Sequence, residues 1–342
     1  MYLALTDEQS FLQEAAQDAL SRLPTREEAR AALDGEAVPS RWDLAVEAGW
    51  TGLLSGEEVD GVGLGAYEAL LVLECCGRVL ADAHLLGHLP AAAVLEAAGS
   101  DTALRRALAS GQRRAALVDA RLGERSRALT LVGRGSEVEI TGEVRSVVDA
   151  DGADVFVVVG ESEDGTRMAA IVEAGEGMSV RPQEAYDATR ALATVSFAGA
   201  AGRMLELSAA QLEIGCALQR ALLAAESVGA ADACLTMARD YAVDRVAFAR
   251  PIGSYQAIKH KIVEMLRHVE GSRSLLVAAG QAWDRKDLPG FVLAAAAARV
   301  ASTEALDYSA PENIFIHGGV GATWEHDCSL YYRRAELSRR LA

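Results

Sequence analysis

The hydrophobic repeat of this 342-residue chain changes twice along its length. Residues 1–110 carry apolar side chains at helical spacing and open with a capping-box pattern at Thr6. Residues 111–203 instead hold alternating or short apolar runs such as Val155–Val159, separated by Gly-Asp turns. Helical spacing returns over 204–342. The order of helices, strands and helices predicts an α+β fold with three domains at these boundaries.

The C-terminal segment contains the longest apolar stripes. One stripe runs through residues 218–241 and a second runs through 258–283. An alanine-rich stretch over 291–306 has side chains small enough to pack closely against both. Long helices with these apolar faces predict an antiparallel helical bundle.

Charge and composition exclude several classes of protein. The chain has 33 Lys and Arg against 49 Asp and Glu, a formal charge of −16, and its pI is near 4.9. Phosphate binding and docking on anionic membranes both need clustered positive charge, so we expect neither a nucleic-acid partner nor a membrane partner. We also expect no apolar segment of the ~20 residues that cross a bilayer. No signal-peptide pattern opens the sequence, which predicts a cytoplasmic protein.

The five cysteines do not form a recognisable ligand or disulfide pattern. They lie at positions 75, 76, 216, 234 and 328, without C-x-x-C pairs or Cys/His ligand spacing. We therefore predict no metal site and no disulfide framework. Cys75 and Cys76 lie within an apolar helical run and are predicted to fill the core.

Two C-terminal segments carry motifs at specific spacing. Residues 245–260 (RVAFARPIGSYQAIKH) resemble the R-x-x-F-G-x-x-I-x-x-x-Q segment of acyl-CoA dehydrogenases. Residues 316–327 (IHGGVGATWEHD) and 332–335 (YRRA) resemble that family's H-G-G-x-G-x-T-x-E and R-x-A segments. Weaker matches at 57–65 and 187–190 occur in the family's order. The resemblance covers essentially the whole chain, which is identified as a member of this family.

The resemblance implies a fold, a reaction and a cofactor. The family consists of an N-terminal helical domain, a middle β domain and a C-terminal antiparallel four-helix bundle, in agreement with the pattern above. Its reaction is the FAD-dependent α,β-desaturation of an acyl-CoA thioester, in which a carboxylate removes the α proton while the β hydride passes to the flavin. The usual electron acceptor is an electron-transferring flavoprotein.

The family's cofactor-binding residues are carried over by their motif positions. Arg245 would place its guanidinium against the FAD pyrophosphate. Phe248 and Gln256 would contact the flavin and adenosine side. Arg220 matches the arginine that opens the first long C-terminal helix and is a candidate substrate-binding residue. Three glycines would let backbone amides face phosphate oxygens: Gly318, Gly319 and Gly321.

Two histidines beside these glycines invite a ligand or base interpretation. His317 lies in the H-G-G segment and His326 lies nine residues later. The family gives neither residue such a role. Both are therefore expected to be structural.

The chain departs from the family where the catalytic base should lie. One family position precedes Arg220 and is Gln219 here, whose amide cannot accept a proton at useful pH. The other, nine residues after the arginine of the R-x-A segment, is Ala342. The family's T-E-P…G-S-D segment, which packs around the flavin ring, is replaced by LVDARLG at 117–123. Phe315 stands where the family usually has a cofactor-binding Gln.

These departures favour the short subunit of a hetero-oligomeric acyl-CoA dehydrogenase. Such a subunit would complete the ADP half of an FAD site whose ring pocket and base come from a longer paralogous partner. This arrangement resembles α2β2 enzymes that act on bulky steroid side-chain CoA thioesters in actinobacteria, so the pathway class is fatty-acid or steroid side-chain degradation.

Two alternatives remain open. In the first, the chain is a stand-alone dehydrogenase with Glu226 as base, since Glu226 lies two helical turns after Gln219 on the same helix face. In the second, it is a non-catalytic homo-oligomer that binds acyl-CoA or acts as a scaffold.

Overall fold

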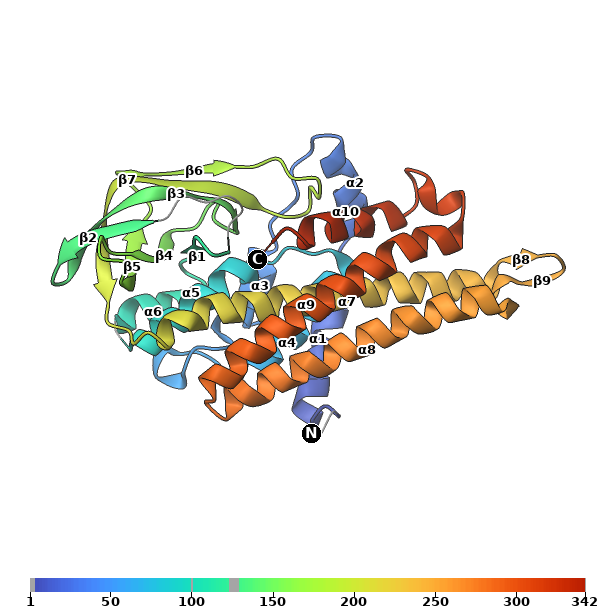
Figure 1. Cartoon of the computed structure of the whole chain (residues 1–342), viewed down its shortest axis with the longest axis horizontal. Helices are drawn as coiled ribbons and strands as arrows, with labels where there is room; N and C mark the ends of the chain where they lie inside the picture. The colour runs from blue at the N-terminus through green and yellow to red at the C-terminus, as the bar shows by residue number, and fades with distance from the viewer. Residues whose placement is uncertain (1–3, 100, 123–128, 342) are drawn as a thin grey trace.

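The computed structural model describes residues 4–99, 101–122 and 129–341, in which helices from both ends of the chain pack together beside a β domain (Figure 1). Thr6 begins the first helix with the expected capping box, because its hydroxyl accepts a hydrogen bond from the Gln9 amide. The described N-terminal residues form six α-helices: α1 (Asp7–Ser21), α2 (Thr25–Leu33), α3 (Trp42–Glu47), α4 (Ala66–Val79), α5 (Leu85–Ala98) and α6 (Thr102–Ala109).

The middle of the chain forms one sheet that closes on itself. Its order is β1-β4-β2-β3-β7-β5 with β6 on β7, and β5 also pairs with β4, so five strands make a ring. Most pairs are antiparallel, while β1 and β4 run parallel. The apolar side chains of β4 are buried on both faces, because α5 and α6 cover the outside. The strands are β1 (Ala115–Asp119), β2 (Thr130–Arg134), β3 (Glu137–Val148), β4 (Val155–Glu161), β5 (Arg167–Glu173), β6 (Met178–Pro182) and β7 (Leu192–Leu205).

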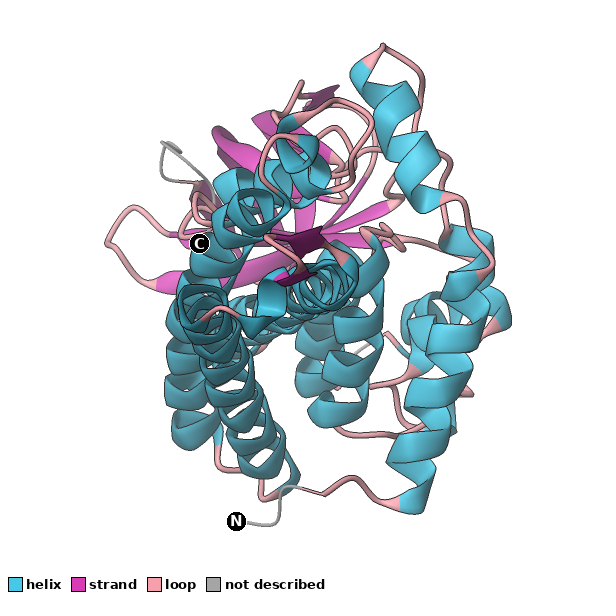
Figure 2. Cartoon of the chain, turned by 90° about the vertical axis from the view of Figure 1, so that its right-hand side faces the viewer, coloured by secondary structure: helices cyan, strands magenta, loops and turns pink. Residues whose placement is uncertain are grey.

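The C-terminal part forms a bundle of three long helices and one short helix. Figure 2, viewed from one end of this bundle, shows the sheet packed on one side of the helices. A two-stranded hairpin lies between the first two long helices. The elements are α7 (Ile214–Asp244), β8 (Val246–Ala247), β9 (Arg250–Pro251), α8 (Gln256–Asp284), α9 (Leu288–His317) and α10 (Cys328–Ser338).

Helix α4 crosses α7 with the two backbones in contact. A Cβ atom at Gly77 would lie 2.0 Å from the Glu226 carbonyl oxygen, and one at Gly229 would lie 1.9 Å from the Glu74 carbonyl oxygen. Glycine is therefore required at both positions for this approach. This crossing packs the N-terminal helices against the bundle beside Glu226.

The α+β order and the helical, β and helical layers predicted from the sequence are confirmed. The expectation that no apolar segment reaches membrane-spanning length was wrong, because residues 211–244, which include α7, are long and apolar enough by hydropathy. Their most apolar window is 83% buried within the protein. The reason is that α7 packs against α4, α5, α8 and α9 and is apolar on most sides.

Candidate functional site

A short hairpin projects from the end of the bundle where α7 ends and α8 begins (Figure 1). Arg245 ends α7 in an extended conformation, and β8 pairs with β9 across a turn at Phe248 and Ala249. Both turn residues have positive φ, 52° and 63°, which costs on the order of 1–3 kcal/mol for each such residue. The Phe248 side chain is 93% exposed. A strained turn that presents an aromatic ring to solvent indicates a contact segment for another molecule.

Hydrogen-bond donors gather around this hairpin. Arg245 is exposed, and its guanidinium has no ion-pair partner among the described residues. Gln256 is the exposed first residue of α8, and its N-cap Tyr255 makes no side-chain cap bond. The first amides of α8 are therefore not capped by that side chain, and such helix N-termini attract anions. The geometry suits a negatively charged group supplied from outside the chain.

The glycine loop lies at the same end of the bundle. The His317 ring stacks on Tyr241 of α7 with centroids 4.3 Å apart, which ties the end of α9 to the end of α7. Gly318 (φ 63°) and Gly319 are exposed, and added Cβ atoms would meet open space. Gly321 is different, because its Cβ would lie 2.7 Å from the His317 Cβ. Gly321 is therefore needed for packing, whereas Gly318 and Gly319 face outward.

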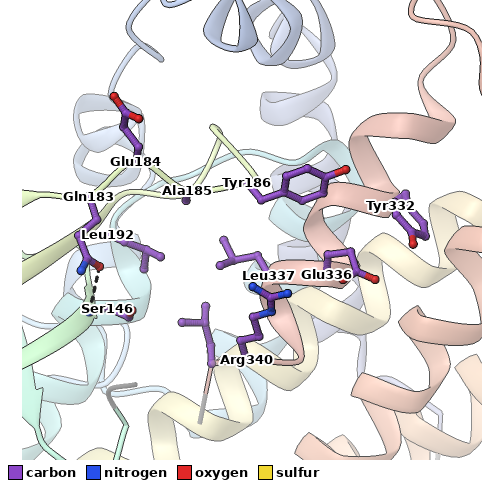
Figure 3. Close-up of a pocket in the computed structure, with 11 residues that line it drawn as sticks. Ser146, Gln183, Glu184, Ala185, Tyr186, Leu192, Tyr332, Glu336, Leu337 and Arg340 are labelled. Carbon is purple, nitrogen blue, oxygen red and sulfur yellow. Dashed lines mark hydrogen bonds between the residues drawn. The ribbon is translucent and has the colours of Figure 1, made fainter. Parts of the chain in front are cut away.

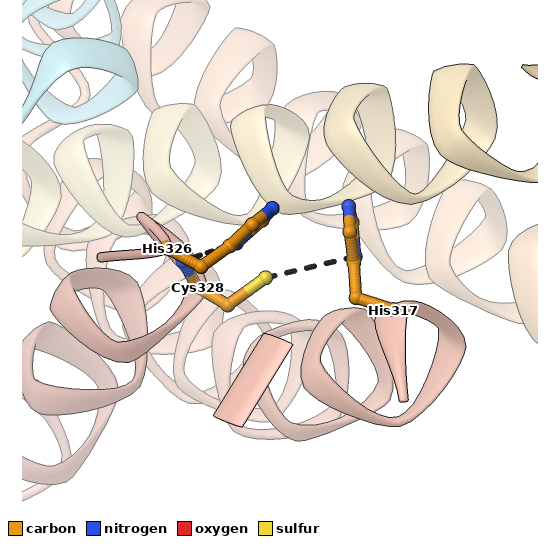
Figure 4. A group of neighbouring side chains, drawn as sticks. All are labelled: His317, His326 and Cys328. Carbon is orange, nitrogen blue, oxygen red and sulfur yellow. Dashed lines mark hydrogen bonds between the residues drawn. The ribbon is translucent and has the colours of Figure 1, made fainter. Parts of the chain in front are cut away.

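Figure 4 shows His317, His326 and Cys328 as a compact cluster under this loop. The His317 Nδ1 lies 2.8 Å from the Asn313 carbonyl oxygen, and the Cys328 amide donates to His326 Nδ1 at 3.3 Å. Burial raises the pKa of the Cys328 thiol to about 12 and lowers the pKa of His317. The thiol and the two rings therefore form a packed polar cluster in which the Nδ1 atom of each histidine contacts a backbone group. One ligand atom from each of the three residues lies within 4.8 Å of the others.

One closed cavity is lined by Gln219 and by the segment that replaces the flavin-ring loop. The Gln219 amide donates to the Leu86 carbonyl at 2.8 Å, which bridges α7 to α5. Leu117, Leu122 and Leu341 fill the space beside it, and the remaining volume is about 10 Å³. That is roughly the minimum for a single water molecule. The cavity fits neither a flavin ring nor an acyl chain.

The predicted site residues thus fall into two separate groups. Gln219 lies near the start of α7 and Arg245 at its end, 26 residues later. At 1.5 Å per residue the two are about 39 Å apart along the helix axis. Arg220 is half-buried beside Gln219, and Phe315 is 65% exposed near the glycine loop, with Lys261 Nζ 4.3 Å from its ring. Ala342 lies outside the described residues, as does the last residue of the 117–123 segment.

Glu226, the alternative base, lies in a buried ion network and is 2% exposed. Its Oε1 accepts hydrogen bonds from Arg190 and, at 2.8 Å, from Arg334. Arg334 also donates to Asp187 and, at 2.7 Å, to the Thr189 hydroxyl. The two guanidinium groups hold the carboxylate between the β6–β7 connection and α10. This carboxylate is not among the groups that line the cavity beside Gln219.

This network went unrecognised in the sequence, although its parts were visible. In the sequence, the 187–190 segment is visible only as a family match, and Arg334 is visible only as part of the R-x-A segment. A buried arginine is rare without a carboxylate partner. Charged residues inside apolar runs were therefore the sequence signal that could have indicated a buried ion network. The pairing itself joins residues up to 147 positions apart.

Asp82 extends the network toward the β domain and makes stability depend on pH. Burial alone would raise the pKa of Asp82, but Arg190, His84 and the amides of His84 and Ala191 bring it down to about 2. A lowered folded-state pKa contributes stability that is present above the unfolded value near 3.9 and is lost as pH falls toward 2.

We therefore expect the free energy of unfolding to fall by about 2 kcal/mol between pH 4 and pH 2 through this group alone. Urea titrations followed by circular dichroism at several pH values measure the slope. In Asp82→Asn, the free energy of unfolding should fall less between pH 4 and pH 2. An unchanged slope in the variant would exclude Asp82 as its source.

The sequence is similar to known families and proteins. It matches the family model "Acyl-CoA dehydrogenase, N-terminal domain" over residues 6–111 and "Acyl-CoA dehydrogenase, C-terminal domain" over residues 211–342. Together with the helical, β and helical layers, these matches define the fold of a class of oxidoreductases that act on acyl-CoA thioesters. The chain belongs to the acyl-CoA dehydrogenase family.

Within this family the chain is similar to acyl-CoA dehydrogenase IpdE2 of Mycolicibacterium smegmatis, at 31% identity over 98% of this chain and 95% of that protein. It is 33% identical to IpdE2 of Mycobacterium tuberculosis, over 88% of this chain and 82% of that protein. Its fold matches the ChsE4-ChsE5 complex of Mycobacterium tuberculosis, with a TM-score of 0.88 and 24% identity over 99% of this chain and 94% of that one.

Proposed function

We propose that this chain is the short subunit of a hetero-oligomeric acyl-CoA dehydrogenase and completes the ADP half of an FAD site held by a longer paralogous partner. The observation that carries the proposal is the contrast between its two candidate regions. The cavity beside Gln219 is closed, whereas the Arg245 hairpin is exposed at the other end of α7.

The small volume of the closed cavity argues against a flavin ring bound beside Gln219. Its residual volume of about 10 Å³ is far below the 300–1,000 Å³ of ordinary ligand sites. The family base position there is an amide that already bridges two helices. We therefore assign the ring pocket and the carboxylate base to the partner in this proposal.

The hairpin argues for a contribution to a site on another subunit. Arg245 lies about 39 Å along α7 from Gln219, so the two do not serve one site within this chain. The exposed guanidinium, the uncapped start of α8 and the exposed backbone amide of Gly319 offer donors suited to a pyrophosphate. Phe248 would reach the flavin side of the same cofactor.

Glu226 is proposed to be structural rather than catalytic. Two buried arginines hold its carboxylate, and the closed cavity lies elsewhere. Arg220 remains the candidate contact for an acyl-CoA group at the subunit interface. The ChsE4-ChsE5 neighbour is a complex of two named chains, and another solved structure of similar fold is a steroid ACAD with a TM-score of 0.87. These names favour a hetero-oligomer and a steroid acyl-CoA substrate. The α2β2 stoichiometry, a fatty acyl-CoA as the other candidate substrate and an electron-transferring flavoprotein as acceptor are proposed from the family resemblance.

Flavin content tests the proposal. Expressed alone, the chain is expected to carry little flavin and show no turnover of CoA thioesters. Co-expressed with a longer acyl-CoA dehydrogenase paralogue from the same genome, it should co-purify with about one FAD per heterodimer. A stoichiometrically yellow, active protein from this chain alone would contradict the proposal. Calorimetric binding of acyl-CoA without partner or flavin would instead favour the homo-oligomeric alternative.

A further inference from the structure

Two aspartates and a histidine meet where the N-terminal helices pack against the β domain. Asp82 and His84 lie in the connection between α4 and α5, and Asp149 directly follows β3. One carboxylate oxygen from each aspartate and one ring nitrogen of His84 lie within 4.8 Å of one another. Asp149 is 0% exposed and Asp82 is 7% exposed. Because the three residues come from two separate segments, the cysteine and histidine spacing of the sequence could not indicate this cluster.

The backbone takes unusual conformations at these segments. A bulge interrupts β3 after Val144, where Ser146 has a φ of 56° and donates its amide hydrogen to Gln183 Oε1 at 3.1 Å (Figure 3). Asp149 and His84 also lie in the left-handed region, with φ values of 57° and 56°. Such conformations are costly for residues that carry a side chain, and they gather at ligand sites.

Two atoms of the cluster face each other without a hydrogen-bond partner among the described residues: His84 Nδ1 and Asp149 Oδ1. They lie 3.6 Å apart, and the same Nδ1 lies 3.9 Å from Asp82 Oδ1. A direct hydrogen bond would bring these atoms to about 2.7–3.2 Å. Two ligands bonded to one Zn²⁺ ion at about 2.0–2.2 Å each are held roughly 3.3–4.2 Å apart. Both separations are therefore too long for hydrogen bonds and match two atoms that share a cation.

The other polar atoms of the three side chains are held by neighbouring groups. The Gly87 amide donates to Asp149 Oδ2 at 2.8 Å, and another backbone amide donates to Asp82 Oδ2 at 3.2 Å. His84 Nε2 lies 3.1 Å from the Ser40 hydroxyl oxygen. With its proton on Nε2, the ring presents the Nδ1 lone pair to the two aspartates. Outer contacts of this kind fix the orientation and tautomer of metal ligands.

The buried charges around the cluster are out of balance. The ion network of Glu226 continues to this cluster, because Arg190 Nη1 lies 3.7 Å from Asp82 Oδ2. With Asp149 included, the linked side chains comprise four carboxylates and two guanidinium groups, which leaves two negative charges. Buried charges are normally paired or bound to a metal. A divalent cation cancels both charges, whereas a proton on the imidazole cancels one.

We propose that Asp82, His84 and Asp149 bind one divalent transition-metal ion, with Zn²⁺ as the best match. The imidazole nitrogen disfavours Mg²⁺ and Ca²⁺, which take oxygen ligands. The ion joins the α4–α5 connection to the end of β3, so it braces the N-terminal helices against the β domain. This site does not depend on the proposed FAD contribution, because it uses no residue of the Arg245 hairpin or of the glycine loop.

Zinc titration of chelator-treated protein tests the proposal. We expect isothermal titration calorimetry to show a Zn²⁺ site in the chain expressed alone, without a partner or flavin. Zn²⁺ should also raise the melting temperature, because an ion that binds only the folded state stabilises it. The same chelator-treated protein serves for the urea titrations of Asp82→Asn, so that protons alone act on that carboxylate.

Three variants locate the ion. Asp149→Asn and His84→Asn each remove a ligand and should weaken Zn²⁺ binding by at least about tenfold. Asparagine tolerates the left-handed conformation of both positions, so neither change adds backbone strain. Ser40→Ala removes only the outer contact of His84 at an exposed position, where the fold is not at risk. It should weaken Zn²⁺ by about tenfold and leave the melting temperature of the metal-free protein unchanged.

His326→Asn is the matched control, because it removes a histidine from the other cluster of possible ligands, which contains His317 and Cys328. It should leave the Asp149-dependent binding of Zn²⁺ unchanged. The proposal is overturned if the parent protein binds no Zn²⁺, or if Asp149→Asn and His84→Asn bind it as tightly as the parent does. Binding that is lost in His326→Asn and kept in those two variants would place the ion at the other cluster instead.

Discussion

Loss of bound FAD is the expected result of replacing Arg245 by alanine in the co-purified hetero-oligomer. The Arg245 guanidinium is exposed and has no described ion-pair partner, so its donors are available to a pyrophosphate. A charge-assisted hydrogen bond contributes roughly 1.5–3 kcal/mol, which corresponds to about 10- to 150-fold in affinity. Flavin retained after gel filtration at decreasing protein concentration measures the effect directly.

The controls separate a lost contact from a damaged fold. Arg239→Ala removes an exposed arginine from the same helix, where it pairs with Asp240, and should leave flavin content unchanged. Arg245→Lys keeps the charge but loses the planar fork, so it should recover part of the affinity. Because Arg245 is exposed, its alanine variant should unfold within about 0.5 kcal/mol of the parent. Full flavin retention in Arg245→Ala would remove this residue from the cofactor site.

The layers of the fold were predictable because they depend on local patterns. The capping box at Thr6 and the switch between helical and strand periodicity both survive in the structure. The length of the apolar stretch in α7 was underestimated. Its many alanines and glycines give little contrast in hydropathy between the faces of the helix. Its close crossing with α4 at Gly77 and Gly229 depends on a partner helix about 150 residues away, which no local pattern specifies.

The candidate site was predictable only in its outline. The motif spacing pointed to Arg245 and the glycine loop, but a sequence alone does not show that the loop's third glycine, Gly321, is a packing position. Nor does it show that the amide of Gln219 bridges two helices while Leu341 fills the neighbouring space. These features arise from side chains that meet only after three layers have packed. The same holds for Glu226, whose helix position suggested a base before its two arginines were placed.

Glu226→Gln is expected to destabilise the protein by about 3–5 kcal/mol, because it leaves the buried Arg190 and Arg334 without a shared carboxylate. The substitution conserves volume, so the loss reports charge rather than packing. Stability of a domain is only about 5–15 kcal/mol, and the variant should therefore unfold at clearly lower urea concentration. Glu304→Gln, on the exposed face of α9, is the matched control and should change stability by less than about 0.5 kcal/mol.

A double variant decides whether the effect belongs to the ion network. Arg334→Met alone should be similarly costly because it disrupts the pairs with Glu226 and Asp187. Combined with Glu226→Gln, the total loss should be smaller than the sum of the single losses, since the two residues share one interaction. If Glu226 were the base of a stand-alone dehydrogenase, Glu226→Gln would instead abolish turnover while leaving the urea midpoint unchanged. A structural Glu226 predicts a lower urea midpoint in the variant, whereas a catalytic Glu226 predicts lost turnover at an unchanged midpoint. Measuring turnover and the urea midpoint of one variant therefore distinguishes a carboxylate that holds the domains together from one that takes a proton.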